Sequence, residues 1–528
     1  MARGKVTQFK LKLKKIYTRI TRNRLTAVFF LFAFFHCFAQ GIIQSLLFVL
    51  DSQYYGLLSD ITQAADIPPA NHTDLSRVSG GFRLEMCNFI PHNSSNCFPI
   101  FDSRDKIIVE NSPDADAQLR GETIIAQLNS QSFKIIADAQ GQSHTVSQVV
   151  FEADGGVGSV NMSESCTSML LYPTQHFQNN RREEIAFMFL QFWLFILSII
   201  AMIHDSVPHV LTVFITRILL TAWSIYALWR TEWQQAVFQQ AIEAPGTSCS
   251  AAMFGVYFST RIPYEIPDII LNCSALGISA FLSWTLLRTY NAEVFTCVGA
   301  PKAITKLYKY FLALQVSLQL EAFVLITAAA LWVDQLFNTY IRNISAHTTV
   351  YEVLVILYAV VLGPWLLTAW FGIRSEKRLV TLAFIFVGIL FILGSSVMFI
   401  SQVYRWRVPF TVAFYTCSFV VKTYRTFYAW PCLGCFITAS LALLVASVVL
   451  GILCYTNFGK GLAQYLYVEA SLSSSNFTPE VFERDVESTY IDNFDDEKLK
   501  AKGLQADFTT HYLPALGSIP SRDSASSG

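Results

Sequence analysis

Long apolar segments dominate the pattern of this chain, and short polar connections separate most of them. Eight segments are long enough to cross a bilayer, since a hydrocarbon core takes about 20 helical residues at a rise of ~1.5 Å each. They lie at residues 25–50, 185–203, 209–229, 267–289, 311–333, 351–373, 379–401 and 432–454. This pattern predicts an all-α polytopic membrane protein, with one N-terminal anchor helix and a seven-helix bundle over residues 185–456.

The one long polar block, residues 51–184, separates the first apolar segment from the others. It contains β-branched runs bounded by Asn, Asp or Gly, which are typical of strands. These runs lie at residues 106–110, 123–127, 133–137 and 146–151. We therefore expect a small β-rich domain, whose sheet topology the sequence does not give.

Glycosylation sequons and basic residues predict the orientation of the chain. Sequons begin at Asn71, Asn93 and Asn161 in the polar block and at Asn343 in a later connection, which indicates an extracytosolic location for both. Residues 1–24 hold nine Lys and Arg residues and no acid, so the positive-inside rule keeps the N-terminus in the cytosol.

The first apolar segment is longer than the ~7–15 apolar residues of a cleaved signal peptide, which favours an uncleaved signal anchor. Following the spans from there also places the tail, residues 457–528, in the cytosol, and its polar composition predicts disorder past about residue 500. We expect a plasma-membrane or secretory-pathway protein. The basic arm could also bind anionic lipid.

One segment fits this topology poorly. Residues 402–431 should be extracytosolic, yet they carry basic residues on both sides of a 14-residue apolar run, residues 408–421. That run is short for a span and is more typical of a re-entrant segment. If it were a ninth span, the tail would lie outside the cytosol.

Four of the eleven cysteines fall in the predicted extracytosolic parts. Four cysteines allow three disulfide connectivities, and the sequence alone does not decide among them. We favour Cys87 with Cys97, which closes a short loop, and Cys166 with Cys249, which would tie the polar block to the 230–266 connection. The second bridge would close a loop of roughly 80 residues and stabilise the fold by up to ~4 kcal/mol.

Two charged residues lie deep within predicted spans. Arg217 lies in the third span and Glu321 in the fifth, at similar predicted depths. An unpaired charge at mid-bilayer costs at least ~2.5–3.5 kcal/mol on insertion scales. We therefore expect the two helices to pack and the two side chains to form an ion pair, either as a structural bridge or as part of a transport path.

Composition and motifs narrow the classes of function. Charged residues make up only 14% of the chain and the net charge is zero, which gives no basis for nucleic-acid binding. Zinc-protease, nucleophile-elbow and phosphate-loop motifs are absent from the sequence. We expect no enzymatic activity, no cofactor and no metal.

Three sequence blocks carry a resemblance: residues 166–173 (CTSMLLYP), 181–185 (RREEI) and 457–462 (NFGKGL). They resemble blocks of a multispanning membrane protein family of basidiomycete fungi that has no assigned activity. The resemblance covers most of residues 20–480, although residues 402–431 are longer than that family's pattern. The layout is also similar to that of Wntless-like seven-helix proteins with a lumenal domain. Both resemblances imply architecture rather than chemistry.

Three hypotheses for function follow. The first is a non-enzymatic protein with a receptor-like, sorting or scaffold role, whose ectodomain binds a ligand or protein that the sequence does not specify. The second is a transporter or channel that uses Arg217 and Glu321. The third is a membrane-embedded enzyme that acts on lipid or glycan.

Overall fold

The structure is a computed structural model that describes residues 24–88, 97–104, 133–136, 148–153, 156–160, 162, 164–204, 206–249, 253–298, 302–339, 348–400 and 430–460. Nearly all of them belong to one compact unit, formed by residues 1–292 and 299–463. The basic arm, the 408–421 segment and the predicted disorder past residue 500 lie outside the described residues.

Eight described helices are long and apolar enough to cross a membrane. They are α2 (Arg24–Ala64), α4 (Glu164–His204), α5 (Val207–Phe238), α6 (Gly255–Val298), α7 (Lys302–Asn338), α9 (Thr348–Arg374), α10 (Arg378–Ile400) and α13 (Pro431–Thr456). A π-helical turn, η1 (Gln239–Glu243), continues α5. The predicted fold class is confirmed, and the spans imply direct contact with lipid.

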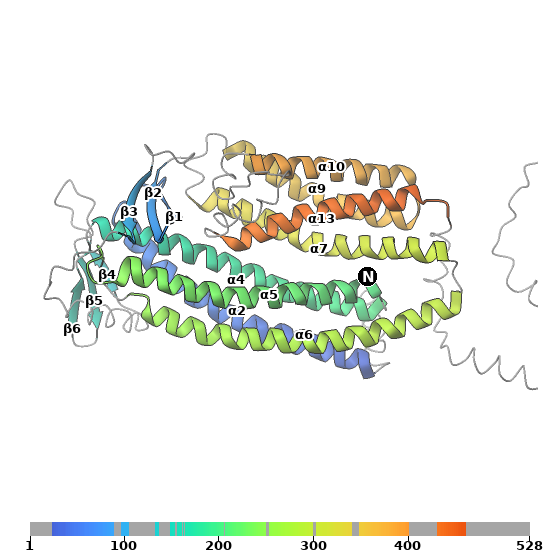
Figure 1. The fold of residues 1–528 in the computed structure, drawn as a ribbon, viewed down its shortest axis with the longest axis horizontal. Coiled ribbons are helices and arrows are strands. Elements are labelled where there is room, and N and C mark those ends of the chain that lie inside the picture. The colour runs from blue at the N-terminus through green and yellow to red at the C-terminus, as the bar shows by residue number, and fades with distance from the viewer. Residues whose placement is uncertain are drawn as a thin grey trace, which may run out of the picture. The chain divides into compact units, whose positions relative to one another are not determined.

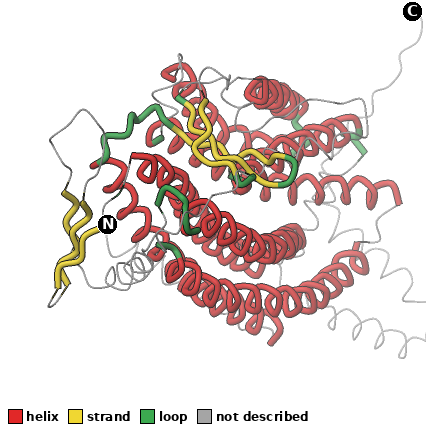
Figure 2. The backbone as a smooth tube through the Cα atoms, turned by 60° about the vertical axis from the view of Figure 1, so that its left-hand side comes forward, coloured by secondary structure: helices red, strands yellow, loops and turns green. Residues whose placement is uncertain are grey.

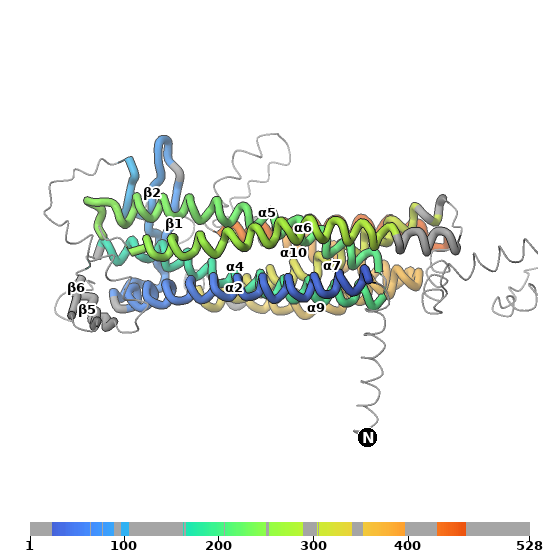
Figure 3. Tube along the Cα trace, turned by 90° about the horizontal axis from the view of Figure 1, so that it is seen from below, coloured from blue at the N-terminus to red at the C-terminus, as the bar shows by residue number. Residues whose placement is uncertain are grey.

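The helices run side by side (Figures 1 and 3), and Figure 1 shows them in two groups, with α2, α4, α5 and α6 in one and α7, α9, α10 and α13 in the other. A buried apolar core that includes Leu194, Leu220, Trp332 and Leu433 joins the two groups. The first helix is more than a separate anchor, because α2 packs along α4 more extensively than any other two helices pack. All eight helices therefore contribute to the bundle.

Two helices are longer than the predicted spans, which changes the boundaries of the polar block. α2 continues to Ala64 and α4 already begins at Glu164, so residues 51–64 and 164–184 are helical. A second buried core covers these extensions, and its aromatic rings include Tyr54, Phe177 and Phe238. The extensions are less apolar than the spans. Only the face that each extension buries against the other needs to be apolar, because the extensions do not face lipid.

The described part of the predicted β-rich domain contains two small antiparallel sheets (Figure 2). One consists of β1 (His72–Val78), β2 (Gly81–Cys87) and β3 (Cys97–Asp102), and the other of β4 (Phe133–Ile136), β5 (Gln148–Ala153) and β6 (Gly156–Val160). The predicted strands at 133–137 and 146–151 are confirmed as β4 and β5, whereas 106–110 and 123–127 lie outside the described residues.

The sequence did not predict the first sheet, because β1 (HTDLSRV) has no β-branched run. A tight turn joins β1 to β2. In this turn Gly80 adopts φ +88°, a left-handed conformation that favours glycine. This sheet packs against α4, with Phe82 in the second core. We call this end of the bundle the sheet end.

Candidate functional site

A stripe of buried polar side chains runs along the faces of α2, α5 and α6 that meet inside the first helix group. We call it the polar stripe, and none of its members is more than 6% exposed. Its members are His36, Gln40, Gln44 and Asp51 on α2, Arg217, Thr221, Ser224 and Thr231 on α5, and Arg261, Glu265, Asp268, Asn272, Ser279 and Ser283 on α6. The spacing of three or four residues, or multiples of it, keeps the members of each helix on one face. From Arg261 to Ser283 the stripe is about 33 Å long, at a rise of 1.5 Å per residue.

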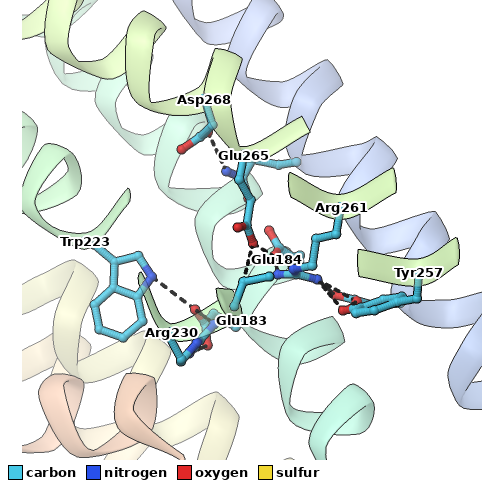
Figure 4. A network of polar contacts seen from close by, with 11 residues as sticks. Glu183, Glu184, Trp223, Arg230, Tyr257, Arg261, Glu265 and Asp268 are labelled. Carbon is cyan, nitrogen blue, oxygen red and sulfur yellow. Dashed lines mark hydrogen bonds and ion pairs between the residues drawn. The ribbon is translucent and has the colours of Figure 1, made fainter. Parts of the chain in front are cut away.

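Arg261 is the centre of the cluster at the sheet end of this stripe (Figure 4). Its Nη1 lies 2.6 Å and 2.7 Å from the two carboxylate oxygens of Asp51, its Nη2 lies 3.0 Å from Oε1 of Glu184, and its Nε lies 2.7 Å from Oε1 of Glu265. The hydroxyl of Tyr257 donates to Asp51 at 2.6 Å. One guanidinium group therefore connects carboxylates from three helices.

A second arginine completes the sheet-end cluster. Arg230 forms a bidentate pair with Glu183, with both N–O distances 2.9 Å, and the indole N–H of Trp223 donates to the same carboxylate at 3.0 Å (Figure 4). Thr231 donates to Oε1 of Glu265 at 2.8 Å and links the two halves of the cluster. Charge-assisted, bidentate bonds of this kind are the strongest hydrogen bonds in proteins.

The sheet-end cluster has more acids than bases. Two guanidinium groups, Arg230 and Arg261, face four carboxyl groups. These four are Asp51, Glu183, Glu184 and Glu265. Because a buried charge without compensation costs several kcal/mol, two of the four carboxyl groups need a proton or a cation to balance them.

The sheet-end cluster lies where the lipid-facing apolar surface ends. The last exposed large apolar side chain of α2 is Val49, two residues before Asp51. On the other helices, exposed Ile185 directly follows Glu184, exposed Trp229 directly precedes Arg230, and exposed Ile266 directly follows Glu265. The remainder of the stripe lies at the level of the exposed apolar side chains, within the part of the bundle that lipid surrounds.

A smaller group of polar side chains lies next along the stripe. Asp268 on α6 accepts hydrogen bonds from the side-chain amides of Gln40, of Gln44 at 3.1 Å and of Asn272 at 3.2 Å. Asn272 also donates to the hydroxyl of Ser224 at 2.7 Å. We call these five residues the Asp268 cluster.

The predicted ion pair between Arg217 and Glu321 is wrong. Arg217 approaches Nδ1 of His36 at 3.2 Å and lies over the ring of Phe32. Glu321 is fully buried, and neither of its carboxylate oxygens has a hydrogen-bond partner among the described residues. α5 and α7 do pack, as a 2.8 Å bond from Thr212 to Gln319 shows. However, Arg217 is on the face of α5 towards α2, whereas Glu321 is near Ser447 of α13.

Both predicted disulfides are present. Cys87–Cys97 joins paired positions of β2 and β3, and Cys166–Cys249 joins the start of α4 to the segment after η1. Both lie at the sheet end.

Glycosylation is not tested by the structure, which describes only one of the four predicted sites. Asn71 precedes β1, is half-buried and donates to the thioether of Met86 at 3.3 Å, and its glycosylation stays a prediction. Asn93, Asn161 and Asn343 lie outside the described residues.

The polar stripe was not predicted from the sequence, partly because several charged residues of this site lie just beyond the ends of the predicted spans. The predicted span 267–289 began after Arg261 and Glu265, and the predicted span 185–203 began after Glu184. The signal was nevertheless present, since Arg261, Glu265, Asp268 and Asn272 recur at helical spacing of 4, 3 and 4 residues. Reading that polar period as one buried helix face would have identified the α6 part of the stripe.

Comparisons with known proteins give no match to a family model, to a curated protein or to a solved structure. The multispanning helical architecture is thus established from the chain itself, and the resemblance to a fungal family stays a prediction.

Proposed function

We propose that the protein transports a monovalent cation across the membrane along the polar stripe. The observation that carries this proposal is the length of the stripe, about 33 Å along α6 by helical rise, together with its excess of carboxyl groups. Ionisable side chains within membrane spans are expensive and characteristically mark ion paths and proton relays. The proposal replaces the Arg217–Glu321 path predicted from sequence and assigns no enzymatic reaction.

Unsatisfied polar atoms along the stripe support this proposal. Within the described part of the chain, buried atoms without a hydrogen-bond partner include Nε2 of His36, Oε2 of Glu265 and the hydroxyls of Ser279 and Ser283. Each such atom costs roughly 1–3 kcal/mol when it is buried. A stripe that only held helices together would be expected to pair these atoms, whereas an ion and its water shell would use them in passing.

The two ends of the stripe support a mechanism in which access alternates. At the sheet end the rings of Tyr54, Phe177 and Tyr257 pack together above Asp51. At the other end Leu282 and Leu286 belong to the apolar core. Aromatic side chains therefore lie at one end of the stripe and leucine side chains at the other, and alternating access would require the packing at each end to open in turn.

A flux assay with paired serine variants tests the proposal. Ser279→Val replaces a hydroxyl within the stripe by two methyl groups, and Ser440→Val makes the same change at a buried site on α13 outside it. In proteoliposomes reconstituted with the full-length protein, we expect a cation flux above that of vesicles without protein. We expect Ser279→Val to lower this flux at least about tenfold and Ser440→Val to leave it unchanged. Flux equal to that of empty vesicles, or equal flux in the two variants, would contradict transport along the stripe.

The sheet end is proposed to be extracytosolic, with both chain ends in the cytosol. Disulfides form and persist in oxidising compartments, and both disulfides lie at this end. The sequon at Asn71 lies there as well. Glycosidase treatment should increase the electrophoretic mobility of the wild type, and Asn71→Gln should abolish part of that change.

A receptor-like role is the second candidate, favoured by one observation. β3 is an edge strand that pairs only with β2 among the described strands, and Phe98 on it is 53% exposed. Such an edge can accept a strand from a peptide or protein ligand. Loss of ligand capture in Phe98→Ser, with unchanged cation flux, would support this role.

A further inference from the structure

The Asp268 cluster points to a specific ligand: we propose that it binds a sodium ion within the membrane. Its role in transport rests on the function proposed above, but the binding itself can be measured without any flux. The argument depends on the charge, the oxygen content and the burial of five residues from three helices.

The first step concerns charge. Asp268 is 6% exposed, and the partners that it bonds are neutral amides. The nearest arginine on the same helix, Arg261, is seven residues away, about 10 Å along α6, and is already bonded to three carboxylates. Arg217 contacts Nδ1 of His36 at 3.2 Å, and no ion pair joins it to Asp268 among the described residues. A single carboxylate without a basic partner, in a site that lipid surrounds, is neutralised by one positive charge. This favours a monovalent ion over a divalent ion.

The second step concerns the ligand atoms. Gln40 and Gln44 both direct Nε2 at Asp268, and the Oε1 atoms of both are buried with no partner among the residues that the structure describes. The two ends of an amide have nearly the same shape, so a half-turn of each group would bring two carbonyl oxygens to the carboxylate. Asn272 directs its Nδ2 at Asp268 and at the hydroxyl of Ser224, so the same half-turn of this third amide would complete a set of oxygen atoms of the kind that hard cations prefer.

The third step concerns selectivity between ions. Among the described residues no group of three or more Asp, Glu, His or Cys side chains is arranged to hold a metal ion. A single carboxylate with neutral oxygens is a weak site for a divalent ion, which usually takes several carboxylates. Sodium satisfies both the single charge and the oxygen ligands. A proton on Asp268 is the competing occupant, and the experiment separates the two.

Thermal unfolding of the purified full-length protein tests this site. The melting temperature is measured in detergent at fixed ionic strength, in sodium chloride, potassium chloride or choline chloride. Because a ligand that binds only the folded state stabilises it, we expect the highest melting temperature in sodium. Asp268→Asn should abolish the difference between the salts. Gln44→Leu, which keeps the carboxylate, should raise the sodium concentration for half-maximal stabilisation at least about tenfold.

Glu321→Gln is the matched control, since Glu321 is also a buried acid without a hydrogen-bonded partner but lies outside the stripe. It should keep the full response to sodium. Equal melting temperatures in the three salts, or an unchanged sodium response in Gln44→Leu, would overturn the site. A response to pH without a response to sodium would assign a proton to Asp268 instead. Sodium binding without cation flux would reject the proposed function and leave the site standing.

Discussion

Replacing Arg261 by methionine should be among the most damaging single changes in the bundle. Methionine keeps much of the length and packing of the side chain but removes the guanidinium group. The substitution strands Asp51, Glu184 and Glu265, which all bond to that group. Three carboxyl groups from three helices would then face one another in a buried site.

The expected loss of stability follows from the carboxylates that are left without a partner after the substitution. Removing one partner of a buried ion pair typically costs about 3–5 kcal/mol, since the other charge is left without compensation. Arg261 is 2% exposed, so water does not reduce this cost appreciably. Taking about 2 °C per kcal/mol, the low end of the range for large domains, the melting temperature should fall by roughly 6–10 °C.

The assay is thermal unfolding of the full-length protein in detergent, followed by size-exclusion chromatography. Arg288→Met is the matched control, because Arg288 is on the same helix but exposed. Its effect should lie within about 0.5 kcal/mol, as for most surface substitutions. Asp51→Asn added to Arg261→Met should recover part of the loss, because one stranded charge is then removed.

Two results would refute this reasoning. If Arg261→Met were no less stable than Arg288→Met, the guanidinium group would not hold the carboxylates in the folded protein. If Asp51→Asn further lowered the stability of the Arg261→Met variant, repulsion among stranded carboxylates would not be the cause of the loss. Deviation from additivity in this pair of substitutions measures the coupling directly.

Three further predictions concern other parts of the molecule. Changing Cys166 and Cys249 together to serine opens a loop with a sequence separation of 83 residues and should cost about 4 kcal/mol, seen as faster proteolysis of the sheet end than in the wild type. Gly388→Ala places a Cβ 2.6 Å from a valine methyl group on α13 and should cost about 1–3 kcal/mol in thermal unfolding, whereas Gly394→Ala, which meets nothing within 4 Å, should cost far less. Hydrogen bonds from two neighbouring arginines hold the pKa of Asp102 well below its ordinary value, so its contribution to the first sheet is complete above about pH 4 and is lost as the pH falls through the lowered pKa. Asp102→Asn should remove that acid-dependent loss from the hydrogen exchange of β2 and β3, and an unchanged pH profile would contradict it.

Apolar runs of about 20 residues were sufficient to predict a membrane protein and the eight described spans. A chain that crosses hydrocarbon must satisfy its backbone hydrogen bonds internally, so each such run is expected to form a helix. Only four cysteines fell in the predicted extracytosolic parts, which limited the disulfide connectivities to three, and the favoured one is confirmed. Both kinds of inference begin from local composition.

The faces that the helices present to one another depend on the tertiary structure. Arg217 and Glu321 have similar predicted depths, yet rotation of α5 and α7 about their axes directs one to His36 and leaves the other near α13. Depth along a helix can be read from residue number, whereas the partner of a helix face depends on how the whole bundle packs.

The extent of the polar block was likewise decided by packing. Residues 51–64 and 164–184 are too polar to resemble spans, but they stay helical because they bury aromatic side chains against one another and against the first sheet. The sequence by itself identified the eight described helices that are long and apolar enough to cross the membrane. Only the tertiary structure decided which polar side chains meet inside it, because burial and pairing arise between helices that are far apart in the chain.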